Sequence, residues 1–171
     1  MSELLQALRA FDGKAISVLS EARARFGEDA NFLGELASLI DSREGSVAAG
    51  ATWLIKNCAE DGVVPGPPEI AAIVDRLDAV PAWQPALHLC QSAAFFAFTP
   101  DQARRFAEWA ARFLDHERPF LRAWAMNALQ HAAGQAPDLA QLAETALIRA
   151  ENDGSASVRA RARKVRAATL D

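Results

Sequence analysis

The strongest constraint on the fold of this chain is a repeat of 37 residues. Three aspartates and an asparagine follow one another at this interval: Asp41, Asp78, Asp115 and Asn152. A largely apolar series has the same interval and consists of Leu36, Ile73, Ala110 and Leu147. Helical pairs that cannot bury their apolar faces alone are commonly stacked at a fixed period. The interval therefore predicts a stack of two-helix units of constant length.

The second helix of each unit carries an apolar stripe of its own. Its members lie at offsets of zero, four and seven, which fall on one face of a helix: Val47, Ala51, Leu54, Leu121, Ala125, Ala128, Val158, Ala162 and Val165. One unit breaks phase, because strict spacing would bury Gln84, His88 and Gln91. We expect a slip of one residue there, which places Trp83, Leu87, Cys90 and Ala94 in the core instead.

Composition favours helices throughout. Alanine occurs 38 times, whereas Val, Ile and Thr together occur 18 times and Tyr is absent. Proline and glycine gather in short clusters that separate apolar periodic segments, and Thr99, Pro100 and Gln102 form a typical capped helix start. These signals predict helices over residues 2–10, 13–26, 29–41, 45–60, 68–79, 83–97, 100–115, 119–133, 138–152 and 155–169.

The segment Leu121 to Leu129 reads LRAWAMNAL, that is, apolar, Arg, two variable residues, Ala, two variable residues, Ala and Leu. This pattern resembles the second helix of HEAT repeats, a family of α-solenoids. Residues 158–162 repeat its start, although Val47-Ala48 lacks the arginine. The resemblance implies an all-α fold, an α-α superhelix of four to five antiparallel helix pairs. It indicates fold more strongly than function.

A chain of 171 residues is expected to form one domain with a substantial core. We expect a single HEAT-like domain over residues 1–171, with an N-terminal capping helix pair at 1–27 and repeats at 28–169. The first residues lack the features of a secretory signal, and no apolar run approaches the ~18 residues of a membrane span. Cys58 and Cys90 form no CxxC pattern. Together these features predict a cytoplasmic protein.

Motifs of catalysis are missing from the sequence. It contains no GxGxxG, GxxxxGK[ST], GxSxG or HExxH, and His88, His116 and His131 include no pair at i, i+4 spacing. In HEAT-like DNA alkylation repair glycosylases a Trp precedes the catalytic Asp by four residues, but none of the four tryptophans here is followed by a carboxylate at that distance. We therefore expect no enzyme, no metal and no cofactor.

Charge is distributed unevenly along the chain. The net charge is −4, yet residues 155–171 contain five basic residues and one acidic residue. The basic end could bind an anionic partner, or it could only make the outer face of a terminal capping helix soluble. The overall acidity and the lack of aromatic residues in this segment disfavour nucleic acid as the ligand.

The HEAT resemblance implies that second helices line a concave groove, and residues opposite the buried stripe should face it. These residues are predicted to bind a protein: Trp53, Lys56, His88, Met126, Asn127, Gln130, Arg163 and Lys164. Trp53 and Met126 are expected to be apolar anchors, since truncating such a residue often costs 2 kcal/mol or more. The 61–68 connection could instead fold over Trp53.

The sequence thus predicts a non-enzymatic protein-binding or scaffold module that presents a concave groove to a protein segment. Two alternatives remain open. One is a HEAT-like enzyme or nucleic-acid factor related to alkylation repair glycosylases or bilin lyase-type repeat proteins. The other is a homo-oligomer formed through an exposed end of the stack. The partner's identity is not contained in the residues.

Overall fold

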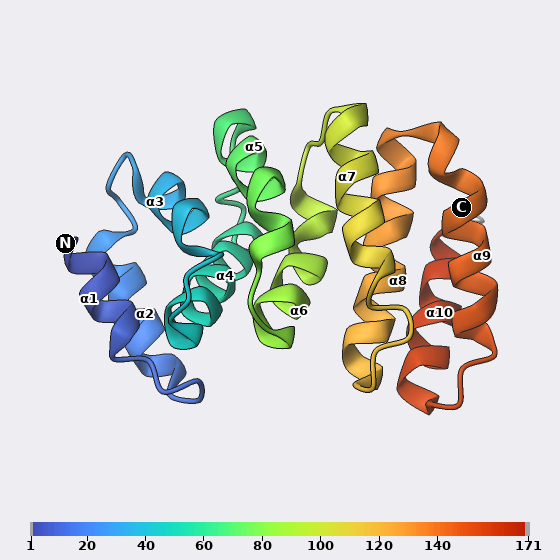
Figure 1. The fold of residues 1–171 in the computed structure, drawn as a ribbon, viewed down its shortest axis with the longest axis horizontal. Helices are drawn as coiled ribbons and strands as arrows, with labels where there is room; N and C mark the ends of the chain where they lie inside the picture. The colour runs from blue at the N-terminus through green and yellow to red at the C-terminus, as the bar shows by residue number, and fades with distance from the viewer. Residues whose placement is uncertain (1, 170–171) are drawn as a thin grey trace. The chain divides into compact units, whose positions relative to one another are not determined.

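Figure 1 shows the computed structural model of the chain, which describes residues 2–169. Within this range all regular structure is helical, which confirms the all-α class. The α-helices are α1 (Glu3–Arg9), α2 (Ile16–Phe26), α3 (Phe32–Leu39), α4 (Gly45–Glu60), α5 (Pro67–Arg76), α6 (Trp83–Ser92), α7 (Pro100–Ala111), α8 (Pro119–Gln135), α9 (Ala140–Glu151) and α10 (Ala156–Ala168). Short 3-10 helices follow α5 and α6 and precede α9: η1 (Leu77–Ala79), η2 (Ala93–Phe95) and η3 (Pro137–Leu139). Every predicted helix is present, and the differences are confined to the ends.

Local chemistry explains where several helices begin and end. At α7 the Gln102 backbone N–H donates to Thr99 Oγ1 (3.3 Å), and the Thr99 N–H donates to Gln102 Oε1 (2.9 Å). This capping box satisfies two amides that would otherwise lack a partner. Helix α4 ends at Glu60, and Gly62 turns the chain just after it with a φ of +87°, which suits glycine. The Val63 N–H donates to the Cys58 carbonyl (2.9 Å).

The helices form two compact units, residues 1–96 and 97–171. In the first unit, α1 packs against α2 and α4, α3 packs against α4 and α5, and α4 packs against α6. Gly50 allows α4 to approach the first two helices closely. A Cβ at this position would lie 3.0 Å from Leu8 Cδ2 and 3.1 Å from Leu19 Cδ2. The α1–α2 pair therefore covers one side of α4.

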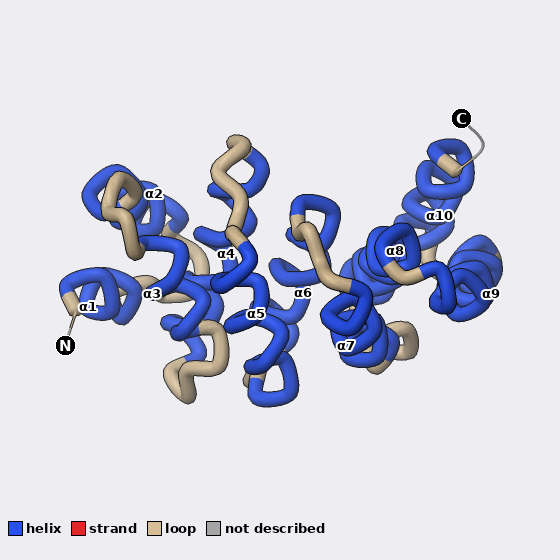
Figure 2. Tube along the Cα trace, turned by 90° about the horizontal axis from the view of Figure 1, so that it is seen from above, coloured by secondary structure: helices blue, strands red, loops and turns tan. Residues whose placement is uncertain are grey.

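In the second unit, α8 is the central helix and packs against α7, α9 and α10. Figure 2 looks down on the helices and shows α8 between α7 on one side and α9 and α10 on the other. Aromatic rings line the α7 side in a contacting series: Phe98 lies on Phe106, Phe106 on Trp109, and Trp109 on Phe113, with centroid distances of 4.9, 5.3 and 5.0 Å. Helix α8 thus packs against three other helices of the second unit.

Residues of the 37-residue repeat lie in the core. The apolar series Leu36, Ile73, Ala110 and Leu147 is fully buried, as are most members of the second-helix stripe. Val165, at the end of that stripe, is only partly buried. Ion pairs follow the repeat too. Asp41 contacts Arg76 (3.9 Å) and Asp115 contacts Arg149, and in each case the arginine belongs to the next helix pair along the chain.

The expected slip in the 83–97 segment is confirmed only in its first part. Leu87 and Cys90 are buried, as the slipped register predicts, and Trp83 is partly buried. The prediction for Ala94 is wrong, because this residue is exposed and Ala93 is buried in its place. The reason is that α6 ends at Ser92 and continues as the tighter η2 turn, which changes the angular position of the residues that follow.

None of the helices described over residues 2–169 has both the length and the apolar character needed to cross a bilayer.

Candidate functional site

The residues predicted to bind a partner fall in both units. Trp53 and Lys56 lie on α4 and His88 on α6, in the first unit. The remaining five lie on α8 and α10, in the second unit: Met126, Asn127, Gln130, Arg163 and Lys164. The structure brings some members of each set together, and the two sets differ in chemistry.

The expected exposure of Met126 is wrong. Its side chain is completely buried, and it lines a small void of about 10 Å³ together with Leu114 and Ala146. The face of α8 that lies opposite the Leu121 stripe is covered by neighbouring helices, which also bury Ala123. Met126 is therefore a core residue and has no exposed surface with which to anchor a partner.

Polar side chains of the first set already have partners within the unit. His88 Nδ1 lies 3.0 Å from Thr52 Oγ1, and this hydroxyl donates to the Ala48 carbonyl (2.8 Å). Burial, with a contribution from the positive charge of Lys56, lowers the pKa of His88 to about 4. Its imidazole is therefore neutral at pH 7. Lys56 Nζ is bound to Glu60 at 2.7 Å, and Trp53 beside it is partly exposed.

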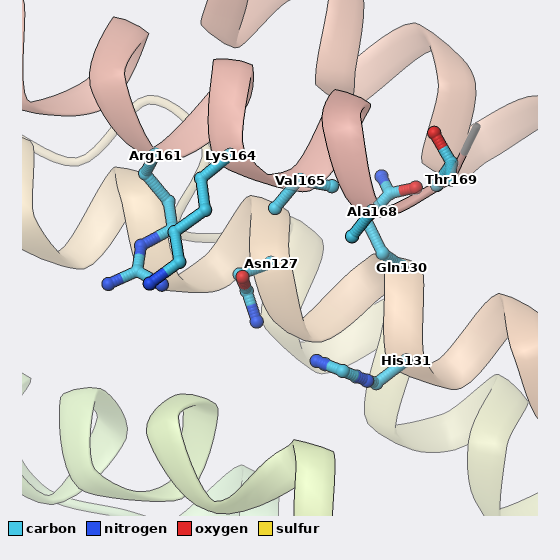
Figure 3. A pocket seen from close by; sticks show the side chains of 8 residues that line it. All are labelled: Asn127, Gln130, His131, Arg161, Lys164, Val165, Ala168 and Thr169. Carbon is cyan, nitrogen blue, oxygen red and sulfur yellow. The ribbon is translucent and has the colours of Figure 1, made fainter. Parts of the chain in front are cut away.

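In the second unit a cavity of about 330 Å³ opens between α8 and α10. Its lining, shown in Figure 3, consists of Asn127, Gln130, His131, Arg161, Lys164, Val165, Ala168 and Thr169. An adjoining cavity of about 300 Å³ is lined by Phe120, Ala123, Trp124, Ser157, Ala160, Arg161 and Lys164. Arg161 and Lys164 line both cavities, which therefore adjoin at these two side chains, and we call the two cavities together the α8–α10 groove.

Asn127 is the most unusual side chain of the groove. It is only 7% exposed, and its amide makes no hydrogen bond to any residue within 2–169. Its amide atoms still contact solvent, because Trp124 Nε1 is the one side-chain nitrogen or oxygen within residues 2–169 that is buried without a partner. In Figure 3 the amide extends from α8 into the open space of the groove. Asn127 can therefore bind an incoming group as donor and as acceptor.

Two other polar residues of the groove differ in how much of their capacity is used. Gln130 Nε2 donates to the Ala143 carbonyl on α9 (2.8 Å), so that this amide also ties α8 to its neighbour. The side chain of His131 has no hydrogen-bond partner in the described part of the chain. Burial lowers the pKa of His131, which keeps its imidazole neutral at pH 7.

Trp124 and Phe120 form an aromatic floor at the other end of the groove. The Arg161 guanidinium lies over the Trp124 ring, 3.9 Å from its centroid, in a cation–π contact. Phe120 stands edge-on to Trp124 at 6.5 Å and is 54% exposed. The Trp124 indole N–H is buried without a partner within residues 2–169. The floor therefore offers apolar surface beside a held cation.

Helix α10 is attached to the unit by arginines other than those of the groove. Arg166 binds Glu151 through two hydrogen bonds (2.9 and 3.0 Å) and also contacts Glu144. Arg122 on α8 binds both carboxylate oxygens of Asp153 (2.9 and 2.8 Å), just before α10 begins. These arginines hold the pKa of Glu151 and that of Asp153 below their usual ranges.

Three other cations of α10 have no such partners. Arg161 and Lys164, which line the groove, and Arg163, which does not, make no ion pair with any described residue. Arg163 and Lys164 are exposed. Of the described residues that line the two cavities, none carries a carboxylate. The groove thus presents hydrogen-bond donors, positive charge and apolar surface, which together suit a ligand rich in acceptors. No group of three or more His, Cys, Asp and Glu side chains within residues 2–169 could hold a metal ion.

Sequence reasoning found Asn127, Gln130 and Lys164 but missed Trp124, His131 and Arg161. A signal for them was present, because Trp124 and Arg161 are separated by 37 positions, as are Asn127 and Lys164. Residues at equivalent positions of stacked units lie side by side, as the Trp124–Arg161 contact illustrates. The same logic with the one-residue slip pairs Thr52 with His88, 36 positions apart.

Comparison of the chain with protein-family models, with curated proteins and with solved structures finds no match.

Proposed function

We propose that this chain is a non-enzymatic, HEAT-like repeat module that binds a segment of a partner protein in the α8–α10 groove. In this proposal the helix pairs form an α-α superhelix, and the partner lies along second helices of successive units. The function resides in surface complementarity, with no reaction and no cofactor. Of the residues predicted from the sequence, Asn127, Gln130 and Lys164 line the groove.

The observation that carries the proposal is the amide of Asn127, which lines the cavity between α8 and α10 and makes no hydrogen bond within residues 2–169. Its oxygen and its NH₂ group are therefore available to a ligand. Peptide backbone supplies both a carbonyl acceptor and an N–H donor, which matches the two ends of an amide side chain. A bound segment would therefore give Asn127 the partners that the described residues do not supply.

The length of the groove supports a segment of protein over a small molecule. The residues of α8 that line the groove run from Phe120 to His131, or ~18 Å at 1.5 Å per residue. An extended peptide rises about 3.3 Å per residue, so about five residues would span this length. The two cavities that share Arg161 and Lys164 would then receive neighbouring parts of one segment.

The repeat contacts support the superhelical arrangement of second helices. Trp124 of α8 lies against Arg161 of α10, and Thr52 of α4 lies against His88 of α6. Both pairs join equivalent positions of consecutive second helices. This is the pattern expected when each unit packs on the next with a small, regular rotation.

The test is a selection of displayed random peptides on the purified protein, followed by calorimetric titration of the recovered peptides. Asn127→Ala should weaken their binding about tenfold, the loss expected for one hydrogen bond to an enclosed amide. Asn31→Ala is the matched control, because Asn31 is exposed and lies outside the groove. Failure to recover any peptide, or equal affinities for wild type and Asn127→Ala, would overturn the proposal.

A further inference from the structure

The cations of α10 divide into two groups with different partners. Arg166 is bound to Glu144 and Glu151, and Arg159 Nη1 donates to the Asp153 carbonyl (2.6 Å). Both therefore serve to hold the helix in place. Arg161, Arg163 and Lys164 have no carboxylate partner in the described part of the chain. Their positive charge is available to a ligand.

We infer that the segment bound by the α8–α10 groove is acidic, with an apolar side chain beside its carboxylates. This inference rests on the proposed function and adds the chemistry of the partner. The carboxylates lie against Arg161 and Lys164, and the apolar side chain lies in the cavity over Phe120 and Trp124. Arg163 is exposed on the same helix, outside the lining of the two cavities, and adds to the positive charge of α10.

Arg161 is positioned to bind a carboxylate. Its guanidinium face is stacked on Trp124, and stacking leaves the N–H groups at the edge of the plane free to donate. Two parallel N–H donors match the two oxygens of a carboxylate. Because the indole already holds the guanidinium, less side-chain entropy is lost when the carboxylate binds.

An apolar neighbour for the acidic residue follows from the second cavity. Its lining combines Phe120, Ala123, Trp124 and Ala160 with the two cations. Phe120 is among the large apolar side chains that remain exposed, at 54%. Covering such a ring removes apolar surface from water, which favours binding at roughly 25 cal/mol per Å². An acidic residue followed by Leu or Phe would use both parts of the groove.

Contrast with the rest of the sequence strengthens the assignment. Residues 1–154 contain 13 basic and 21 acidic residues, so an acidic peptide is repelled by most of the chain and attracted by α10. A nucleic acid is favoured less, because its affinity depends on neutralising many phosphates, whereas the groove offers two unpaired cations, Arg161 and Lys164. The acidic peptide is the occupant that fits both the charges and the apolar floor.

The experiment uses fluorescence anisotropy with labelled synthetic probes. The first probe is a peptide of about ten residues that alternates Glu or Asp with Leu or Phe. The second has Gln and Asn in place of the acidic residues, and the third is a single-stranded oligonucleotide of similar length. The acidic peptide should bind, and the neutral peptide should bind about tenfold more weakly. Added salt should weaken only the acidic complex.

Variants locate the binding. Arg161→Gln should weaken the acidic peptide about tenfold, and Arg161→Lys should restore only part of the loss, because Lys keeps the charge but not the planar fork. Lys14→Gln is the control with the same change of charge, since Lys14 is exposed and outside the groove. Circular dichroism of each variant verifies the fold.

The outcomes separate this inference from the function on which it rests. If the neutral peptide binds as well as the acidic one while Asn127→Ala still weakens both, the acidic partner is wrong and the protein-binding function stands. If the oligonucleotide binds more tightly than the acidic peptide and loses affinity in Arg161→Gln, the groove is a nucleic-acid site and both proposals are wrong. Equal binding of the acidic peptide to wild type and Arg161→Gln also overturns the inference.

Discussion

The α4–α6 pair and the α8–α10 pair both place polar residues between their two helices, but with opposite results. Between α4 and α6, Thr52 and His88 bind each other, and Lys56 is bound to Glu60. Between α8 and α10, the amide of Asn127 and the cations Arg161 and Lys164 lack such partners among the described residues. Polar groups are therefore paired by internal hydrogen bonds in the α4–α6 pair, which we call the closed pair, and are left available in the α8–α10 pair, which we call the open pair.

The difference originates in the second helix of each pair. Helix α6 buries Leu87, Leu89 and Cys90, and so fills the space next to α4 with apolar side chains. Helix α10 buries only Val158 and Ala162, and its remaining surface is rich in Arg and Lys. Because α10 has few core residues, it leaves space beside α8. An interface of the first kind contributes stability, whereas the second kind leaves binding capacity unused.

The largest effect is expected from Arg122→Ala, which removes the ion pair with two hydrogen bonds between α8 and Asp153. The variant loses two hydrogen bonds to the carboxylate and those to the His116 and Glu117 carbonyls. It also leaves Asp153 without its charged partner, so the free energy of unfolding should fall by about 3 kcal/mol. Hydrogen exchange measured by mass spectrometry should show faster exchange in α10. Unchanged protection of α10 would mean that this helix is held in some other way.

The second effect concerns the α4–α6 pair, whose contribution to the free energy of unfolding should depend on pH. The pKa of His88 is about 4 in the folded protein, below the ordinary value of 6.5, so the unfolded chain binds more protons between these pH values. Stability therefore falls as the pH falls through this window, by about 2 kcal/mol from pH 7 to pH 5. Denaturant unfolding at both pH values measures it. In His88→Gln this part of the pH dependence should vanish, and an undiminished slope in that variant would contradict the assignment.

The third effect removes one hydrogen bond from the closed pair. Thr52→Val keeps the shape of the side chain but deprives His88 Nδ1 of the hydroxyl at 3.0 Å. Leaving a buried imidazole nitrogen without its partner should cost about 1–2 kcal/mol of unfolding free energy. Faster hydrogen exchange in α4 and α6 would verify it. Thr145→Val is the control and should change the free energy of unfolding little, because Thr145 is exposed on α9. Equal losses in the two variants would show that the Thr52–His88 bond contributes nothing.

The sequence predicted the helices and the buried series well, because both depend on local spacing. Alanine-rich segments between proline and glycine clusters have one regular structure available to them, and residues such as Leu36 and Leu147 recur at the interval at which units stack. The η2 turn was not foreseen, since nothing in the 83–97 segment marks a change from the α-helical to the tighter spacing. Ala94 was assigned to the core for that reason.

The candidate site was predicted only in part, for a different physical reason. The angular position of a residue around its helix, measured from the apolar stripe, shows whether it faces the other helix of its own pair. A central helix such as α8 has several neighbours, so a residue opposite the stripe can still be buried. Met126, placed outward by that angle, is buried by the helices that pack against α8. The 37-residue interval was applied to the buried series, to the aspartates and to outward residues such as Asn127 and Lys164, but not to Trp124. Applied to Trp124, it would have given Arg161 as the neighbour.

The smallest effect on stability is expected at Asn127, and it tests the open pair directly. Asn127→Leu replaces an amide that has no internal partner with an apolar group beside a cavity of about 330 Å³. Since no hydrogen bond within residues 2–169 is broken, the free energy of unfolding should change by less than about 0.5 kcal/mol or increase. Denaturant unfolding of this variant beside Thr52→Val makes the comparison. A loss above about 1 kcal/mol at Asn127 would mean that its amide is already satisfied in the folded chain. In that case the two helix pairs would not differ as argued, and the groove would lose its main reason to bind a partner.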